Sequence, residues 1–197
     1  MTDGSAPSQE RLQHLVDRQD IYDRITQVSR AIDRFDKALF VSAYHDDAVI
    51  DAGGLVADPA TVYDHGKDLH EQGQKSTLHN LMNHRCDIDG DIAHAETYFL
   101  YTGVNQDDTN WVAGGRYVDR LERRAGEWKI SFRLTTIEWS GIVPRTVVPL
   151  FEGVPDIGLN GTPSRNASDP SYVRPLENRR ERRVPDDAGA MGTPPSA

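Results

Sequence analysis

The chain has 197 residues, which is enough for one folded domain with additional segments. Its formal net charge is −9, whereas nucleic-acid-binding proteins usually present a basic face, so the composition does not indicate nucleic-acid binding. Its apolar runs fall well short of the roughly 20 residues that a transmembrane helix needs, so we expect no membrane-spanning segment.

Cysteine content and the N-terminal sequence bear on the cellular compartment. Cys86 is the only cysteine, so an intramolecular disulfide cannot form and a reducing environment is expected. The first ten residues are polar and lack the apolar core of a secretory signal. We therefore expect a soluble cytoplasmic protein in which Cys86 is a small buried residue rather than a nucleophile.

Apolar periodicity predicts a long first helix over about residues 9–34. One face of this helix carries apolar residues spaced by four, three and four positions: Ile21, Ile25, Val28 and Ile32. Asp36 is a suitable N-cap for a short second helix, on whose apolar face we place Tyr44. After a short strand at residues 48–52, Asp58 and Pro59 supply the cap and first turn of a third helix that continues to about residue 74.

From Ser76 onward the pattern changes to strands rich in β-branched and aromatic residues. Four strands are expected, at residues 78–88, 92–104, 111–123 and 128–139. Three helices followed by a long antiparallel meander define an α+β class. We expect this sheet to curl around the helices into a cone-shaped α+β barrel, whose open mouth forms a ligand cavity.

Composition divides the chain into a disordered N-terminus (1–9), the α+β-barrel domain (10–140) and a C-terminal extension (141–197). Nine of the eleven prolines lie in the extension, which we expect to be partly docked and flexible at its end. Four of its apolar residues are suited to docking on the domain or on a neighbouring subunit: Val147, Val148, Leu150 and Phe151. The basic cluster at 178–183 is more typical of a solvated tail than of an anion contact.

Several segments, in the expected order, resemble the SnoaL-like, nuclear-transport-factor-2-like family. They are residues 30–36, 42–49, 89–98, 114–123 and 126–130. Within this family the resemblance is to the branch that contains scytalone dehydratase and hexachlorocyclohexane dehydrochlorinase. It implies a cone-shaped fold, a His–Asp dyad, no metal and no organic cofactor. It also implies a homo-oligomer, with a trimer ahead of a dimer.

The resemblance assigns three catalytic residues. The family's aspartate ends the first helix and corresponds to Asp33, and its histidine begins the first long strand and corresponds to His79. An arginine of the last strand, five residues after the family's tryptophan, corresponds to Arg133. The family enzymes carry a tyrosine or lysine where this chain has Val28, so an ancillary proton donor is not expected at that position.

The chemistry of a His–Asp pair fits proton abstraction. A carboxylate in a partly dry pocket needs a partner. By accepting a hydrogen bond from one ring nitrogen of His79, Asp33 would fix the tautomer and raise the basicity of the other nitrogen. That nitrogen could then remove a proton from carbon. Taken alone, the residues also allow a surface Asp33 at a helix end and a hydrogen-bonded or exposed His79 at a strand entrance.

Strand alternation assigns faces to the candidate site residues. It places His79 with Leu81 and Asn83 on one face of their strand, and Arg133 on the face opposite Trp128 and three other apolar residues. Arg133 could stabilise a departing oxygen, halide or enolate. It could equally form a structural ion pair with an acidic neighbour, for which the candidates are Glu138, Asp51 and Asp119.

Five further residues are candidates to bind an apolar substrate, although core packing is the commoner role of such side chains. They are Tyr44, Asp51, Trp111, Tyr117 and Trp139. The other six histidines show neither i,i+4 pairing nor cysteine neighbours, so a metal site is not expected. Gly114 and Gly115 lie inside a predicted strand, where they favour sheet bending over phosphate binding.

Three functions remain open at this point. The absence of any cofactor motif favours a cofactor-independent lyase that eliminates water or a halide from a small, largely apolar cyclic molecule. The same dyad could run an isomerisation or a polyketide-type aldol cyclisation. The departure at Val28 favours the third function, a non-catalytic ligand-binding or assembly module.

Overall fold

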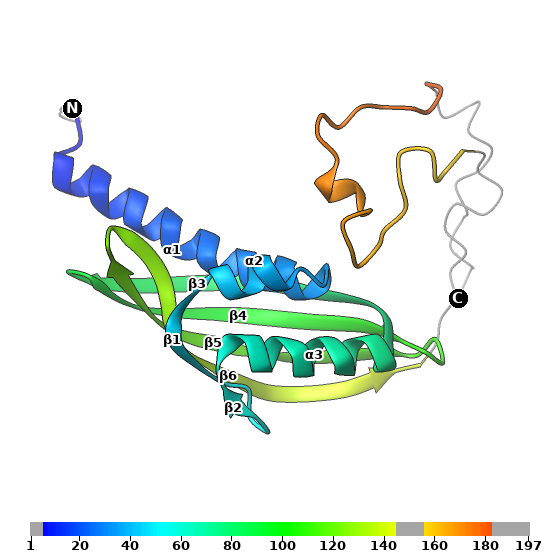
Figure 1. The fold of residues 1–197 in the computed structure, drawn as a ribbon, viewed down its shortest axis with the longest axis horizontal. Coiled ribbons are helices and arrows are strands. Elements are labelled where there is room, and N and C mark those ends of the chain that lie inside the picture. The colour runs from blue at the N-terminus through cyan, green and yellow to red at the C-terminus, as the bar shows by residue number, and fades with distance from the viewer. Residues whose placement is uncertain (1–5, 145–155, 183–197) are drawn as a thin grey trace, which may run out of the picture.

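The computed structural model describes residues 6–144 and 156–182. Its three helices pack against a single curved sheet (Figure 1). Their bounds are α1 Gln9–Asp33, α2 Lys37–Ser42 and α3 Pro59–Gly73. The predicted caps are confirmed, because Asp36 accepts a hydrogen bond from the Leu39 N–H and Asp58 accepts from the N–H groups of the first turn of α3.

The sheet has six strands in the order β2-β1-β6-β5-β4-β3. Their bounds are β1 Tyr44–Asp51, β2 Val56–Ala57, β3 Gln74–Asp89, β4 Ile92–Asn105, β5 Asn110–Arg124 and β6 Glu127–Val143. The predicted α+β cone and the antiparallel meander from β3 to β6 are confirmed. However, β1 pairs with β6 in parallel, so the sheet is mixed. Within residues 6–144 and 156–182 no strand pairs with the outer sides of β2 and β3, so the sheet does not close there.

Several element boundaries differ from the sequence expectation, among them the start of β3 at Gln74 and those of β1 and β6. Tyr44 begins β1 rather than belonging to the second helix, and its side chain is buried. β6 runs to Val143, three residues beyond the expected end of the domain at 140. β1 and β6 are longer than predicted because their additional residues pair with a neighbouring strand. Tyr44 pairs with Ile130, and the end of β6 pairs with the start of β5.

Bulges in β3 and β6 overturn two of the predicted faces. Pairing of β3 shifts between Leu81 and His84, so Asn83 is exposed instead of sharing the inner face with His79. In β6 the pairing passes from Ile130 directly to Phe132, which leaves Ser131 as an extra residue. Arg133 is therefore buried on the same face as Trp128 and Ile130, because an inserted residue inverts the alternation that follows it.

The face of α1 that the apolar spacing predicted to be buried lies in the core. The four apolar residues predicted for this face are each 9% exposed or less: Ile21, Ile25, Val28 and Ile32. Cys86 packs in the same core, and burial raises the pKa of its thiol, in agreement with a structural role. At Gly114 and Gly115 an added β-carbon would overlap the Trp139 ring and the Thr136 carbonyl oxygen, so the sheet needs glycine where it bends.

Part of the C-terminal extension, residues 156–182, is described by the structure and contains a short 3₁₀ turn, Pro170–Tyr172. Its contacts reach α1 and the end of α3. The expectations for the first five residues, for the apolar residues at 147–151 and for the last part of the extension lie outside the described residues. In the part of the chain that is described, no helix has the length and apolarity to cross a membrane.

Candidate active site

Asp33 and His79 form a close, nearly buried pair at the junction of α1 and β3. The Nδ1 atom of His79 lies 2.7 Å from Asp33 Oδ1. The Thr77 hydroxyl donates to the same oxygen at 2.9 Å, and the His79 backbone N–H donates to Oδ2 at 2.9 Å. Because a carboxylate only accepts hydrogen bonds, the neutral imidazole carries its proton on Nδ1 and has its lone pair on Nε2.

Local structure explains why these two side chains meet. Asp33 is the last residue of α1, where the helix dipole disfavours a negative charge, so the carboxylate is stabilised by three donors instead. Thr77 and His79 are two residues apart in β3 and therefore share its inner face, shortly after α3 ends at Gly73. The structure thus brings together the two residues that the family resemblance assigned to a dyad.

His79 lines two adjoining cavities beneath the helices. The larger has a volume of about 220 Å³ and the smaller about 140 Å³. Four residues line both: His70, His79, Tyr117 and Thr135. Apolar side chains dominate the larger cavity, and each volume is below the about 300–1,000 Å³ that is usual for drug-sized ligands. The space therefore suits a small, largely apolar molecule.

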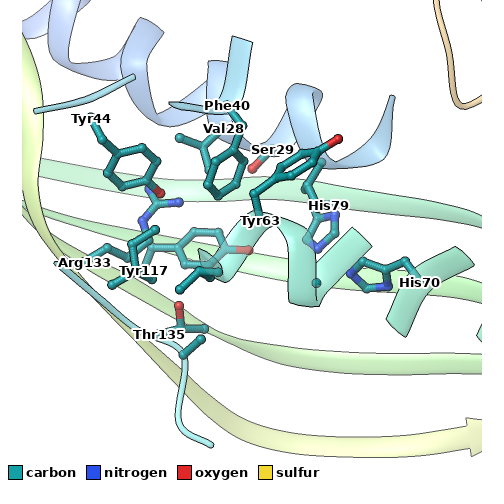
Figure 2. A pocket seen from close by; sticks show the side chains of 15 residues that line it. Val28, Ser29, Phe40, Tyr44, Tyr63, His70, His79, Tyr117, Arg133 and Thr135 are labelled. Carbon is teal, nitrogen blue, oxygen red and sulfur yellow. The ribbon is translucent and has the colours of Figure 1, made fainter. Parts of the chain in front are cut away.

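Arg133 lies at the other end of the larger cavity (Figure 2). Its Nε and Nη2 atoms donate to the two oxygens of Asp119 at 2.7 and 2.9 Å, and both side chains are buried. Of the acidic partners considered from sequence, Asp119 is thus the one observed. Asp119 does not engage Nη1, so the guanidinium can serve both as half of a structural ion pair and as a cavity-lining donor.

The Tyr44 hydroxyl is a buried polar group that is available to a ligand. It points toward the Arg133 guanidinium in Figure 2, which attracts it electrostatically, but no group among the described residues makes a hydrogen bond of full geometry with it. Burial raises the pKa of Tyr44 and raises that of Tyr117 to about 12, so both phenols keep their protons near neutral pH. A bound molecule could satisfy the Tyr44 hydroxyl, whose burial is otherwise unfavourable.

The remaining predicted binding residues separate into two groups. Trp111 lines the smaller cavity, and Tyr117 lines both. Asp51 and Trp139 line neither of the two cavities. The Asp51 carboxylate accepts the Gly53 N–H in its own turn, and Trp139 is half exposed over Gly114.

His70 was missed by the sequence reasoning and belongs to the same site. Its Nδ1 lies 3.1 Å from Gln74 Oε1 and 3.2 Å from the Tyr101 hydroxyl, and its ring centroid is 5.6 Å from that of His79. Burial, and then the proximity of His79, lower the pKa of His70, which favours a neutral ring. Its spacing from Tyr63 and Gly66 on α3 is the helical signal that could have placed it on the inner face.

Comparison with known families identifies the class of protein. Residues 13–134 match the model of the SnoaL-like domain family. The chain therefore belongs to the SnoaL-like family, and the resemblance seen in the sequence is confirmed. A comparison with curated proteins gives no match.

Solved structures with the same fold include enzymes of the expected branch. Hexachlorocyclohexane dehydrochlorinase LinA-type3 from Novosphingobium barchaimii LL02 is 20% identical, with a TM-score of 0.64, over 71% of this chain and 99% of that one. A scytalone dehydratase-like protein from Novosphingobium aromaticivorans is 16% identical, with a TM-score of 0.59, over 68% and 93%. At these identities the likeness establishes the shared fold.

Proposed function

We propose that the protein is a cofactor-independent lyase, in which His79 removes a proton from a carbon atom of a small, largely apolar cyclic substrate. The observation that supports this most strongly is the Asp33–His79 pair beside a largely apolar cavity. The names of the structural neighbours, a dehydrochlorinase and a dehydratase-like protein, favour elimination of a halide or of water. Membership of the SnoaL-like family is in keeping with this chemistry.

In the proposed reaction, His79 Nε2 takes the proton as the C–H bond breaks. The electron pair forms a carbon–carbon double bond, and the leaving group departs with the electrons of its own bond. Asp33 stabilises the imidazolium that results, through the Nδ1 hydrogen bond. Tyr44 and Arg133, at the other end of the cavity, are placed to donate hydrogen bonds to the departing halide or oxygen.

The test is a turnover assay with hexachlorocyclohexane, scytalone and related cyclic halides and alcohols, in which chloride release and product mass are measured. We expect His79→Ala to lower kcat about 10²–10⁴-fold, because a positioned base contributes that much to proton transfer. His65→Ala is the matched control, since His65 is an exposed histidine of α3, and it should keep wild-type turnover.

Product mass separates the alternatives. Elimination removes the mass of water or of a hydrogen halide, whereas isomerisation and ring closure by the same dyad preserve mass. Wild-type turnover in His79→Ala would contradict all reactions that use the dyad. Tight retention of one of these compounds by the wild-type protein, without turnover, would favour a ligand-binding module instead.

A further inference from the structure

The C-terminal extension packs against the end of α1 that carries Asp33. Asp169 is buried and lies 3.4 Å from the Arg34 guanidinium, and the Tyr172 hydroxyl donates to Asp36 at 3.1 Å. Arg30 donates to the Ser171 hydroxyl at 3.2 Å, and its guanidinium lies 4.6 Å from the centre of the Tyr172 ring. The extension thus contacts residues before and after Asp33 in the sequence, namely Arg30, Arg34 and Asp36.

A second contact of the extension is made by Arg165 at the junction of α3 and β3. Its Nη1 donates to the His70 carbonyl at 3.0 Å, and its Nη2 donates to the Gln74 carbonyl at 2.7 Å. The His70 carbonyl also accepts the N–H of Gln74, the C-cap of α3, and the planar guanidinium joins this carbonyl to that of Gln74 in a fixed geometry. Arg165 thereby fixes the turn that leads from α3 into β3, where Thr77 and His79 follow.

The same guanidinium also contacts the residue that ends the turn after α1. It lies 4.5 Å from the centre of the Phe35 ring, and Phe35 has a φ of 52°. A left-handed backbone is unfavourable for a bulky residue and persists only where its surroundings hold it. The Nζ atom of Lys67, on α3, lies 5.7 Å from the centre of the same ring.

We propose that Arg165 is a positioning residue for the dyad, because it ties the α1 end that carries Asp33 to the α3–β3 turn that leads to His79. The Asp33–His79 distance depends on how these two elements are placed relative to each other, and Arg165 contacts both. Its importance for turnover rests on the lyase function proposed above. Its effect on the geometry of the pair does not.

The extension lies beyond the residues that match the SnoaL-like family model. The SnoaL-like match ends at residue 134. The dehydrochlorinase structure matches 71% of this chain, although 99% of its own length is covered. Arg165 therefore supports the dyad from a segment beyond the family domain.

The test uses the full-length protein and the low-field proton NMR signal of His79 Nδ1–H, assigned by its loss in His79→Ala. We expect Arg165→Gln to broaden this signal or shift it upfield, and to raise amide exchange at residues 31–36 about tenfold or more. Arg165→Lys, which keeps the charge and one donor, should restore part of the effect. Arg179→Gln is the matched control, because Arg179 is an exposed arginine of the extension, and it should behave as wild type.

With an active substrate, we expect Arg165→Gln to lower kcat about tenfold or more while KM stays within about twofold, because small misplacement of a catalytic group acts mainly on the chemical step. An unchanged Nδ1–H signal in a folded Arg165→Gln protein, or an equal change in Arg179→Gln, would overturn the proposal. If Arg165→Gln does not fold, Tyr172→Phe replaces it, since it removes only the hydroxyl bond that anchors the extension to Asp36.

Tyr172→Phe is expected to change the signal in the same direction by a smaller amount, and no change in it would also count against the proposal. The two proposals fail differently. A wild-type protein that turns over none of the compounds but shows the Arg165 dependence contradicts the lyase and supports the positioning role. Turnover that depends on His79 but not on Arg165 supports the lyase and contradicts the positioning role.

Discussion

Asparagine in place of Asp33 is expected to lower kcat/KM by about 10⁴-fold, the magnitude known for this change in the Ser-His-Asp proteases. The carboxylate accepts three hydrogen bonds, two on Oδ1 and one on Oδ2. An amide nitrogen at the Oδ2 position would face the His79 N–H, a second donor. At the Oδ1 position it would donate to the ring and favour the tautomer with its proton on Nε2. The first arrangement is unfavourable because two donors face each other, so we expect the second, in which Nε2 carries the proton and loses its lone pair.

The control for Asp33→Asn is Asp20→Asn, an exposed position on the same helix, for which we expect wild-type kcat/KM. Circular dichroism and thermal unfolding establish whether both variants are folded. A folded Asp33→Asn protein with kcat/KM within threefold of wild type would show that the carboxylate has no part in the reaction.

Alanine in place of Asp119 is expected to lower the free energy of unfolding by about 3–5 kcal/mol, measured by urea denaturation at pH 7. The substitution leaves the Arg133 guanidinium buried without its paired carboxylate. Although burial opposes the charged form, the neighbouring carboxylate outweighs it and raises the pKa of Arg133, so the charge remains and is expensive to bury alone. A loss below about 1 kcal/mol would mean that water or another group replaces Asp119.

The double variant Asp119→Leu with Arg133→Met separates the two roles of Arg133. Replacing a buried ion pair by apolar residues of similar volume is often neutral or stabilising by about 1–4 kcal/mol. We therefore expect this variant to recover most of the stability lost in Asp119→Ala. If Arg133 also assists the leaving group, kcat of the double variant falls about 10²–10³-fold although the protein is folded. Wild-type kcat in the double variant would assign Arg133 to structure alone.

The helices could be predicted because their signals are local. The spacing of Ile21 and Ile25, the cap at Asp36 and the Asp58–Pro59 start each depend on a few neighbouring residues, and all are confirmed. The parallel pairing of β1 with β6 joins segments about eighty positions apart. Alternation within a strand describes its faces and says nothing about its partner, so this part of the sheet could not be predicted.

The site shows the same division between local and long-range information. Residue chemistry alone left both a catalytic and a structural role open for Asp33 and His79, and the family resemblance assigned them to one dyad. Alternation gave the wrong face for Arg133, because nothing in the sequence marks Ser131 as an extra residue. The contact of Arg165 with the His70 and Gln74 carbonyls depends on the path of an irregular segment and has no periodic signal.

The most direct test of the central claim is ¹⁵N NMR of the His79 ring in the wild-type protein at neutral pH. We expect a proton on Nδ1, hydrogen-bonded to Asp33, and an unprotonated Nε2. A ring with its proton on Nε2, or one whose nitrogen shifts do not change in Asp33→Asn, would contradict a base held ready in the cavity.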